Sequence, residues 1–359
     1  MLKRIKGLGL REKGLRAIGA GHVYDRLAQL EIERSRLLSE LRQAEGRHKA
    51  AEKAHQATLE RNEHDKREAA SNHQLEIEAK TYLDGMRSSN RLVEIDYPAY
   101  PRVRFGWDQP PHPQLFKLLS SRDDHYRGVL RSFLPLLETA SRIAPRATDN
   151  AGEPHWVNDW LPAFDAISLY GFIATRRPRR FLEIGSGNST LFARRAVRDW
   201  SPDTKIVSID PAPRAEVDAQ CDEVIRLPLE EVSLSLFESV TSDDIVFFDG
   251  SHRAFQNSDV TVFFTEILPM LPVGTLVGVH DIFLPYDYPQ HWLGRWYSEQ
   301  YLLASWLLGG ERLRVELPVA HCGHVSSIHS VLAPYWTHAS LADSGHHGGA
   351  FWFSVAASP

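Results

Sequence analysis

Short apolar runs alternate with amphipathic stretches between about residue 155 and residue 355. Buried strands are typically short apolar runs bounded by turn residues, whereas helices repeat apolar residues three and four positions apart. Strands are therefore predicted over residues 180–184, 205–209, 223–227, 244–248, 275–279, 313–317 and 350–355. Helices are predicted over residues 165–174, 189–198 and 260–271. The alternation predicts an α/β fold, with a Rossmann-like, mostly parallel sheet covered by helices on both faces.

Residues 22–85 follow another pattern, without proline and rich in Glu, Arg, Lys, Ala and His. Apolar residues recur there at the alternating three- and four-residue spacing of a coiled coil, at Val23, Leu27, Leu30, Leu37, Leu41, Ala44 and Ala51. Arg34, His48 and later polar residues occupy core positions and weaken this seam. We expect one long helix whose first half pairs with a second copy of the chain, making a homo-oligomer. The alternative is a single charged helix stabilised by ion pairs between residues four apart.

Residues 1–21 mix basic and apolar side chains, as do helices that bind a membrane surface. Five glycines in this stretch disfavour a helix, so a solvated lead-in is favoured over membrane contact. The net charge of −5 argues against a nucleic-acid partner that is bound through bulk positive charge. The two cysteines are too few for a disulfide framework, which favours a cytoplasmic protein.

Five prolines mark residues 96–113 as an irregular connector, since proline fixes φ and lacks an N–H donor. Residues 114–144 are predicted to form a helix with an apolar side. We therefore divide the chain into a helical arm (1–90), a proline-rich connector with a helical lid (91–154) and an α/β domain (155–359).

A glycine-containing turn follows the first predicted strand, in the sequence Phe181-Leu-Glu-Ile-Gly-Ser-Gly-Asn-Ser-Thr190. Gly185 permits the tight turn, and Gly187 lets a ligand approach the backbone without a Cβ in the way. The helix that begins after the turn presents free N–H groups to a polar ligand. This strand–turn–helix arrangement predicts a ligand site at the carboxyl ends of the strands.

Three further predicted strands end in ionisable residues. Asp210 ends the second strand, where a carboxylate can accept hydrogen bonds from both ribose hydroxyls of a nucleotide. Asp249 ends a later apolar strand in the sequence Asp249-Gly-Ser-His252, and His280-Asp281 end the strand after it. The glycine turn and Asp210 would also suit NAD, but Thr190 stands where the NAD motif has its third glycine.

These motifs together resemble the class I S-adenosylmethionine-dependent methyltransferase family, in particular small-molecule O-methyltransferases with EIGSGNST, Asp-Gly-x-His and His-Asp motifs. The resemblance covers about residues 165–355 and has no counterpart in the first 95 residues. It implies S-adenosylmethionine as the cofactor, an antiparallel last strand, and a hydroxyl of a small molecule or saccharide as the acceptor. The cofactor-binding residues that follow from it are Glu183, Gly185, Ser186, Gly187, Asn188, Ser189, Asp210 and Asp249.

The resemblance also implies where the catalytic residues lie. Metal-dependent members hold a hard divalent ion with carboxylates after the fourth and fifth strands, and they use a lysine as base. Asp249 matches the first ligand, His280-Asp281 replace an Asp-Asn pair, and His252 takes the position of the lysine. We expect Asp249, His252, His280 and Asp281 to form the catalytic centre, with His252 as the base. If a divalent metal is used, Asp249, His280 and Asp281 are its expected ligands.

Two other functions stay open at this stage. An NAD-dependent oxidoreductase would use the same glycine turn, and a non-catalytic Rossmann-like scaffold would be assembled by the coiled coil. Glu230 follows the third predicted strand and is either an adenine contact or a solvated surface residue. Residues 283–297 are rich in aromatic side chains and predict a ligand-binding surface, a dimer contact or part of the core.

Overall fold

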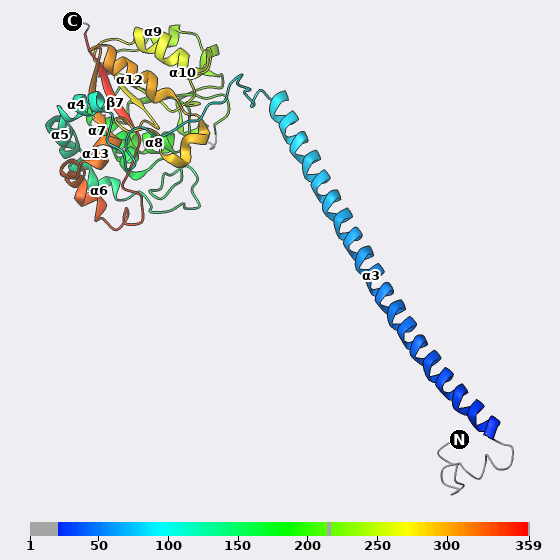
Figure 1. Ribbon diagram of the computed structural model, residues 1–359. Helices are drawn as coiled ribbons and strands as arrows, with labels where there is room; N and C mark the ends of the chain where they lie inside the picture. The colour runs from blue at the N-terminus through cyan, green and yellow to red at the C-terminus, as the bar shows by residue number, and fades with distance from the viewer. Residues whose placement is uncertain (1–20, 214–216, 358–359) are drawn as a thin grey trace. The chain divides into compact units, whose positions relative to one another are not determined.

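A computed structural model describes residues 21–213 and 217–357, and Figure 1 shows its helices and strands. The chain divides into two units, Met1–Pro98 and Ala99–Pro359. Membrane-surface contact was weighed for residues 1–21, of which 1–20 lie outside the described residues. Across the described ranges, no helix combines the length and the apolar character that a bilayer-crossing segment requires.

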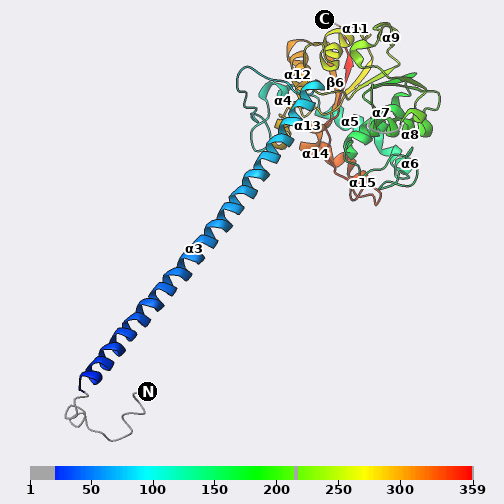
Figure 2. The same ribbon diagram turned by 90° about the vertical axis from the view of Figure 1, so that its right-hand side faces the viewer.

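The first unit contains one long helix, α3 (Gly21–Ser88), which confirms the helix predicted over residues 22–85. Its 68 residues correspond to a length of about 100 Å at 1.5 Å per residue, and Figure 2 shows it without a break. The apolar side chains of the predicted seam are exposed, with Val23 63% and Leu37 57% accessible. Ion pairs between residues four apart, such as Arg36–Glu40, also occur. Pairing of α3 with a second copy therefore stays a prediction.

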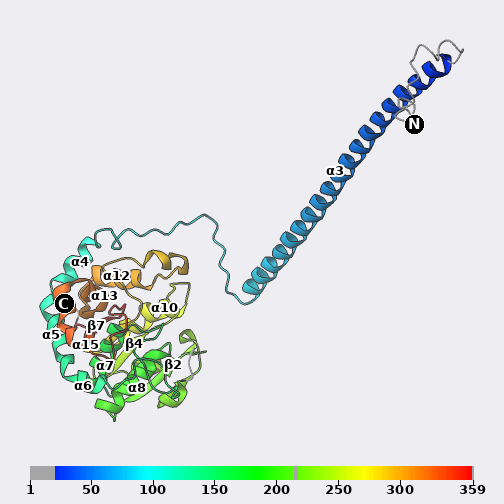
Figure 3. The same cartoon turned by 90° about the horizontal axis from the view of Figure 1, so that it is seen from below.

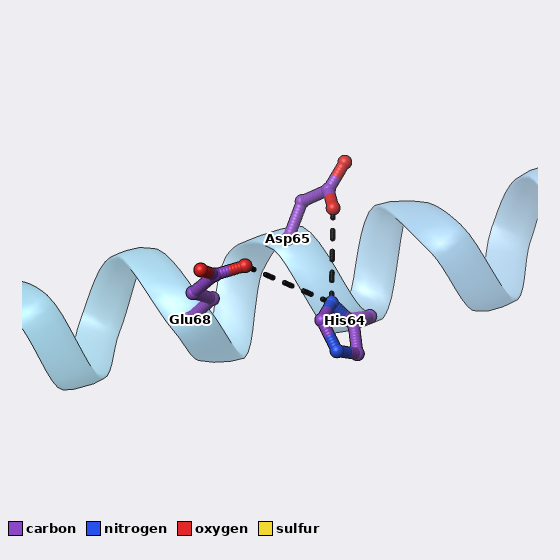
Figure 4. Close-up of side chains that lie close together, drawn as sticks. All are labelled: His64, Asp65 and Glu68. Atoms are coloured by element: carbon purple, nitrogen blue, oxygen red, sulfur yellow. Dashed lines mark ion pairs between the residues drawn. The ribbon is translucent and has the colours of Figure 1, made fainter.

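One histidine on α3 lies close to two acidic side chains (Figure 4). The Nδ1 atom of His64 is 3.8 Å from Asp65 Oδ1 and 3.9 Å from Glu68 Oε2. All three side chains are at least 66% exposed. Exposed ion pairs of this kind contribute little to stability, because water screens them.

The second unit is built on a seven-stranded sheet with the order β3-β2-β1-β4-β5-β7-β6. Its strands are β1 (Arg180–Ile184), β2 (Lys205–Ile209), β3 (Glu223–Ile225), β4 (Ile245–Phe248), β5 (Leu276–Val279), β6 (Leu313–Pro318) and β7 (Phe351–Val355). Strands β1 to β5 pair in parallel, whereas β7 is antiparallel to both β5 and β6. The mostly parallel sheet and the antiparallel last strand are thus confirmed.

Helices cover both faces of this sheet, which is why its central strands are mostly apolar. Successive residues of a strand point to opposite faces. Phe247 contacts Trp352, which in turn packs on Phe172 of α7 (Ala163–Arg176) at a ring distance of 4.8 Å. Phe248 stacks on Phe263 at 4.4 Å on the other face. Figures 2 and 3 show α7 and α8 (Asn188–Trp200) side by side.

The strand register brings four chain segments to one edge of the sheet. Ile184 of β1 is paired with Ile209 of β2 and with Phe248 of β4, and Phe248 is paired with Val279 of β5. These four strands therefore end at the same level. The residues that follow them, which include the glycine turn and the predicted strand-end acids, meet at this edge.

Two predicted helices are less regular in the structure: a turn at residues 121–122 interrupts the first, and each has a segment that is not α-helical at or beside a proline. Residues 114–144 form α4 (Pro113–Ser120), α5 (Asp123–Phe133), a 3-10 turn and α6 (Leu137–Ala140). Pro135 lies in that turn, since proline has no N–H for a continuous helix. Residues 260–271 form α10 (Asp259–Val262), a π-helical segment, η4 (Phe263–Ile267), and α11 (Leu268–Met270). Pro269 follows η4, where its missing N–H removes a helical bond.

The remaining elements are short. Residues 96–113 form no strand, and only Pro113 is helical, so the irregular connector is confirmed. The other helices are α9 (Ser235–Glu238), α12 (Glu299–Gly309), α13 (Val319–His324), α14 (Ser326–His329) and α15 (Ala333–Trp336), with a 3-10 helix, η5, at Gln290–Arg295.

Candidate active site

The two glycines of the turn after β1 serve different purposes. Gly185 has a φ of +82°, and a Cβ there would lie 1.8 Å from the carbonyl oxygen of Asp249. Only glycine fits this left-handed, crowded position. Gly187 has an extended backbone, and a Cβ there would meet no atom within 4 Å. The open space above Gly187 is where a ligand can approach the backbone.

Glu183 lies beneath the turn and is fully buried. Thr190 donates its hydroxyl proton to Glu183 Oε2 at 2.5 Å, and the N–H of Gly187 donates to the same hydroxyl at 3.0 Å. Burial raises the pKa of Glu183 to about 8, although the hydroxyls of Ser189 and Thr190 lower it in part. Glu183 therefore holds the turn in shape from below.

Asp210, at the end of β2, is fixed by two backbone groups. Its carboxylate accepts the N–H of Ser186 in the glycine turn and the N–H of Ala212, each at 2.8 Å. The first bond ties the end of β2 to the glycine turn. Asp210 is only partly buried, so a ligand at the strand ends can reach its carboxylate.

A cavity of about 480 Å³ lies over the carboxyl ends of β1, β2 and β4. This volume lies within the range of small-molecule and cofactor sites. Its walls come from the glycine turn, the residues after β2 and β3, and the residues after β4: Gly185, Ser186, Gly187, Asn188, Ser189, Asp210, Leu229, Glu230, Asp249 and His252. All predicted cofactor residues line it except Glu183. Trp160, a loop residue that no sequence pattern singles out, also lines it.

The predicted catalytic residues meet beside this cavity. The Nε2 atom of His252 lies 3.5 Å from Asp249 Oδ1 and 3.5 Å from Asp281 Oδ2. The Nδ1 atom of His280 lies 3.3 Å from the same Asp249 oxygen and 3.6 Å from Asp281 Oδ1. Both histidines are buried, with His252 5% and His280 3% exposed. The ligand atoms of Asp249, His280 and Asp281 all lie within 4.8 Å of one another.

Two buried acids that the sequence did not single out hold these histidines. Glu299, the first residue of α12, lies 2.6 Å from His252 Nδ1. Asp165 of α7 lies 3.1 Å from His280 Nε2 and also accepts the N–H groups of Gly349 and Ala350. Asp165 is an isolated acid within an apolar helix, which was the one available signal for a buried polar role.

The charges of this cluster determine the protonation of the histidines. Burial lowers the pKa of His252, but Glu299, Asp249 and Asp281 raise it more, to about 9. Burial also lowers the pKa of His280, and Asp249 and Asp281 raise it well above its usual value. Burial raises the pKa of Asp281 despite the nearby histidines. The three carboxylates therefore favour the protonated form of His252, and its role as the base stays a prediction.

An aromatic wall adjoins the cluster. The ring of Tyr297 lies 4.4 Å from the ring of His252, and Trp292 lies 5.6 Å from Tyr297. The guanidinium of Arg295 lies 4.0 Å above Trp292, and that of Arg253 lies 5.1 Å above Tyr297. The aromatic segment singled out in the sequence therefore reaches the candidate active site.

Comparison with known proteins gives a family match over the centre of this unit. Residues 182–282 match a protein family described as a methyltransferase domain. No curated protein matches the chain at a significant level.

Several solved methyltransferase structures are similar to the chain. The O-methyltransferase TomG from Streptomyces achromogenes, crystallised with SAM, is 17% identical, with 62% of this chain and 95% of that chain covered and a TM-score of 0.35. The Podospora anserina methyltransferase PaMTH1, with SAH bound, is 16% identical, with 70% and 100% covered and a TM-score of 0.36. An O-methyltransferase from Bacillus cereus in complex with SAH is 14% identical, with 64% and 91% covered and a TM-score of 0.33.

The family match includes the glycine turn, Asp210, Asp249 and the His280-Asp281 pair. It starts within β1 and ends just after β5, so it spans the strands that carry the cavity. The match argues against the NAD-dependent alternative. The chain thus carries a methyltransferase domain on a Rossmann-like, mostly parallel sheet.

Proposed function

We propose that this enzyme transfers the methyl group of S-adenosylmethionine to a hydroxyl oxygen of a small molecule or saccharide. The observation that carries the proposal is that Asp249 and His252 line the cofactor cavity and also belong to the buried Asp/His cluster. Methyl transfer needs the acceptor atom roughly 3–3.5 Å from the methyl carbon and in line with the bond that breaks. A polar cluster in the cavity wall offers a hydroxyl such a position.

The cofactor is expected to occupy the cavity with its methionine part at the glycine turn and its ribose at Asp210. The turn at Gly187 leaves space for the methionine part against the backbone. The carboxylate of Asp210, held by two N–H groups, keeps lone pairs for the ribose hydroxyls. Both features are held by contacts within the chain itself, and a preorganised site loses less entropy on binding.

The acceptor hydroxyl must also lose its proton. Asp249 is the most accessible member of the cluster, with 27% of its side chain exposed, whereas Asp281 is 16% and His280 4% exposed. We assign to Asp249 the contact with the acceptor hydroxyl, whose proton it would accept. We assign to His252, His280 and Asp281 the positioning of the Asp249 carboxylate. These four residues form the proposed catalytic centre.

The acceptor itself is expected to carry a ring or another flat apolar surface. Tyr297 lies beside His252, and Trp292 packs against Tyr297, so aromatic rings stand next to the cluster. Aromatic side chains recognise both aromatic and saccharide rings through such faces. The wall therefore supports a small-molecule or saccharide acceptor.

The test is methyl transfer from labelled S-adenosylmethionine to pools of phenols, hydroxylated metabolites and saccharides, followed by mass spectrometry of the products. A product methylated on oxygen is expected, and Asp249→Asn should greatly reduce its formation. Transfer only to nitrogen or sulfur acceptors, or transfer unaffected by Asp249→Asn, would contradict the proposal.

We also propose that α3 pairs with α3 of a second copy. The seam leaves several leucines exposed, and burying each one contributes roughly 1.5–3 kcal/mol. Ion pairs such as Arg36–Glu40 stabilise the helix itself but do not cover these leucines. The arm would then bring two methyltransferase units into one homo-oligomer.

A further inference from the structure

We propose that the indole of Trp160 covers the methionine end of the bound cofactor and recognises the positive charge of its sulfonium. Trp160 would then help the site to distinguish S-adenosylmethionine from S-adenosylhomocysteine, the uncharged product of methyl transfer. The inference rests on the proposed position of the cofactor in the cavity, but it does not depend on the acceptor. Three observations carry it: how the loop of Trp160 is held, how exposed its indole is, and which charges line the cavity.

Trp160 lies in a loop that one asparagine side chain holds in shape. The Oδ1 atom of Asn158 accepts the N–H of Trp160 at 3.1 Å and the N–H of Leu161 at 2.7 Å. The amide nitrogen of Asn158 donates to the carbonyl oxygens of His155 and Leu161 at 3.0 and 3.1 Å. Bonds of this kind between a side chain and the nearby backbone fix a turn that belongs to no helix or strand. The backbone that carries the indole is therefore held from within the loop.

The same asparagine fastens this loop to the glycine turn. The side-chain amide of Asn188, the first residue of α8, donates to Asn158 Oδ1 at 3.1 Å. Asn188 directly follows Gly187, where the backbone is open to a ligand. Trp160, Gly187 and Asn188 all line the cavity. The loop of Trp160 is thus tied to the turn that is expected to receive the methionine part of the cofactor, which includes the sulfonium.

The indole of Trp160 is exposed, whereas apolar neighbours in its loop are buried. Trp160 is 61% accessible, but Trp156 is only 1% and Leu161 only 2% accessible. Trp156 packs on Phe192 of α8 at a ring distance of 5.3 Å, so it anchors the loop to the domain. Covering an exposed apolar ring is favourable, because it removes apolar surface from water. A ligand in the cavity would supply that cover to Trp160.

The described residues that line the cavity favour a positively charged ligand. They include the acids Asp210, Glu230, Asp249 and Asp259, and none of them is a lysine or an arginine. Apart from a histidine, Trp160 is also the one aromatic residue among them. The face of a tryptophan ring attracts a cation more strongly than the faces of the other aromatic side chains do. The sulfonium of S-adenosylmethionine is such a cation, whereas the sulfur of S-adenosylhomocysteine is a neutral thioether.

A comparison of the two cofactor forms separates the charge contact from ordinary packing. Apolar cover by the indole acts on both forms, because they share the methionine chain and the adenosine. Attraction between the ring face and the positive charge acts on S-adenosylmethionine alone. The ratio of the two dissociation constants therefore reports the charge contact, and it cancels a general loss of packing or of folded protein.

The experiment measures both dissociation constants by calorimetry on the full chain. Trp160→Leu should weaken the binding of S-adenosylmethionine more than that of S-adenosylhomocysteine, by a factor of about 3–30. Trp160→Phe should give a smaller change in the same direction. Sinefungin, which carries an ammonium group in place of the methylated sulfonium, should lose affinity as S-adenosylmethionine does. Phe255→Leu is the control and should keep the ratio, because Phe255 is an exposed aromatic residue that does not line the cavity.

Tryptophan fluorescence adds a second readout. Either cofactor form should shield Trp160 from the quencher acrylamide in the wild type, and Trp160→Leu should lose this shielding. The proposal is overturned if Trp160→Leu weakens both forms by the same factor, if it leaves both unchanged, or if sinefungin follows S-adenosylhomocysteine. A wild type that binds neither form would overturn the cofactor position and this inference with it. Methyl transfer to nitrogen or sulfur alone would instead reject the proposed acceptor and leave the role of Trp160 standing.

Discussion

Among the residues that the structure describes, two groups of three or more histidine and carboxylate side chains come close together, one on α3 and one at the carboxyl edge of the sheet. The first, His64 with Asp65 and Glu68, spans a single helical turn and is exposed to water. The second joins His252 and His280 to acids from β4, β5, α7 and α12, and its histidines are at most 5% exposed. The same residue types therefore stand in opposite environments.

This difference in burial shows that residues close in sequence need not interact strongly, whereas residues far apart in sequence can. Neighbours on a helix come close automatically, but water weakens their interaction. Asp165 lies 115 residues from His280, yet burial makes their contact strong enough to fix the histidine ring. The same contrast separates the exposed α3 from the buried sheet, and the predictions below test it.

The largest expected effect is on turnover. His252→Ala removes a residue that lines the cavity and lies 3.5 Å from both proposed catalytic aspartates, so loss of positioning should lower turnover by about 100-fold. Affinity for S-adenosylhomocysteine should stay near that of the wild type. His64→Ala on α3 is the control and should keep full activity. Near wild-type turnover in His252→Ala would remove this residue from the mechanism.

The next effect concerns the stability of the glycine turn. Gly185→Ala places a Cβ 1.8 Å from a backbone oxygen at a φ of +82°, which should lower the free energy of unfolding by more than about 2 kcal/mol. Gly187→Ala meets no atom within 4 Å and should change it by less than about 0.5 kcal/mol. Urea denaturation of both variants measures the difference. Equal stability of the two would contradict the described turn.

These two glycines show which features of the site could be predicted from the sequence alone. The motif predicted a turn and a ligand approach, and the structure assigns the turn to Gly185 and the open approach to Gly187. All seven strands were predicted, because buried strands are short apolar runs that stand out without tertiary information. Their common ending level, and hence the meeting of Asp210, Asp249 and His280, could only be inferred from the fold class.

Other features could not be predicted, for identifiable physical reasons. Glu183 was assigned to the cofactor, but its buried bond to Thr190 depends on a turn geometry that no pattern encodes. Glu299 pairs with His252 across 47 residues, and one acid at the start of a helix reads as an ordinary first-turn residue. The 3-10 segment at Pro135 and the π-helical segment before Pro269 were missed because the apolar spacing continues through them.

A smaller effect is expected in the pH dependence of stability. The pKa of Glu183 is raised to about 8 in the folded protein, so the folded state holds a proton that the unfolded state releases above about pH 4.3. Stability should therefore fall between about pH 5 and pH 8, by roughly 2–4 kcal/mol. Glu183→Gln should remove most of this slope, and Glu68→Gln on α3 should keep it. Chemical denaturation at several pH values measures the slopes, and a wild-type stability that rises over this range would contradict the burial argument.

The smallest effect is expected in the arm. Leu37→Lys places a charge in the α3 seam and should weaken self-association by roughly 1.5–3 kcal/mol, without changing methyl transfer per chain. Ile32 is 72% exposed and lies on the opposite side of the helix from the seam, so Ile32→Lys is the control. Light scattering over a concentration series measures the mass. Equal association of the wild type and Leu37→Lys would mean that α3 stays a single charged helix.

Binding of S-adenosylhomocysteine tests the central claim most directly, because it requires only the cavity and no knowledge of the acceptor. The wild type should bind at micromolar concentration in calorimetry. Gly187→Val combined with Asp210→Ala should abolish binding, since the first fills the open approach and the second removes the ribose contact. Gly310→Val is the matched control, as Gly310 is also extended, meets no atom within 4 Å and lies outside the cavity. Micromolar binding that survives the double change would contradict the account.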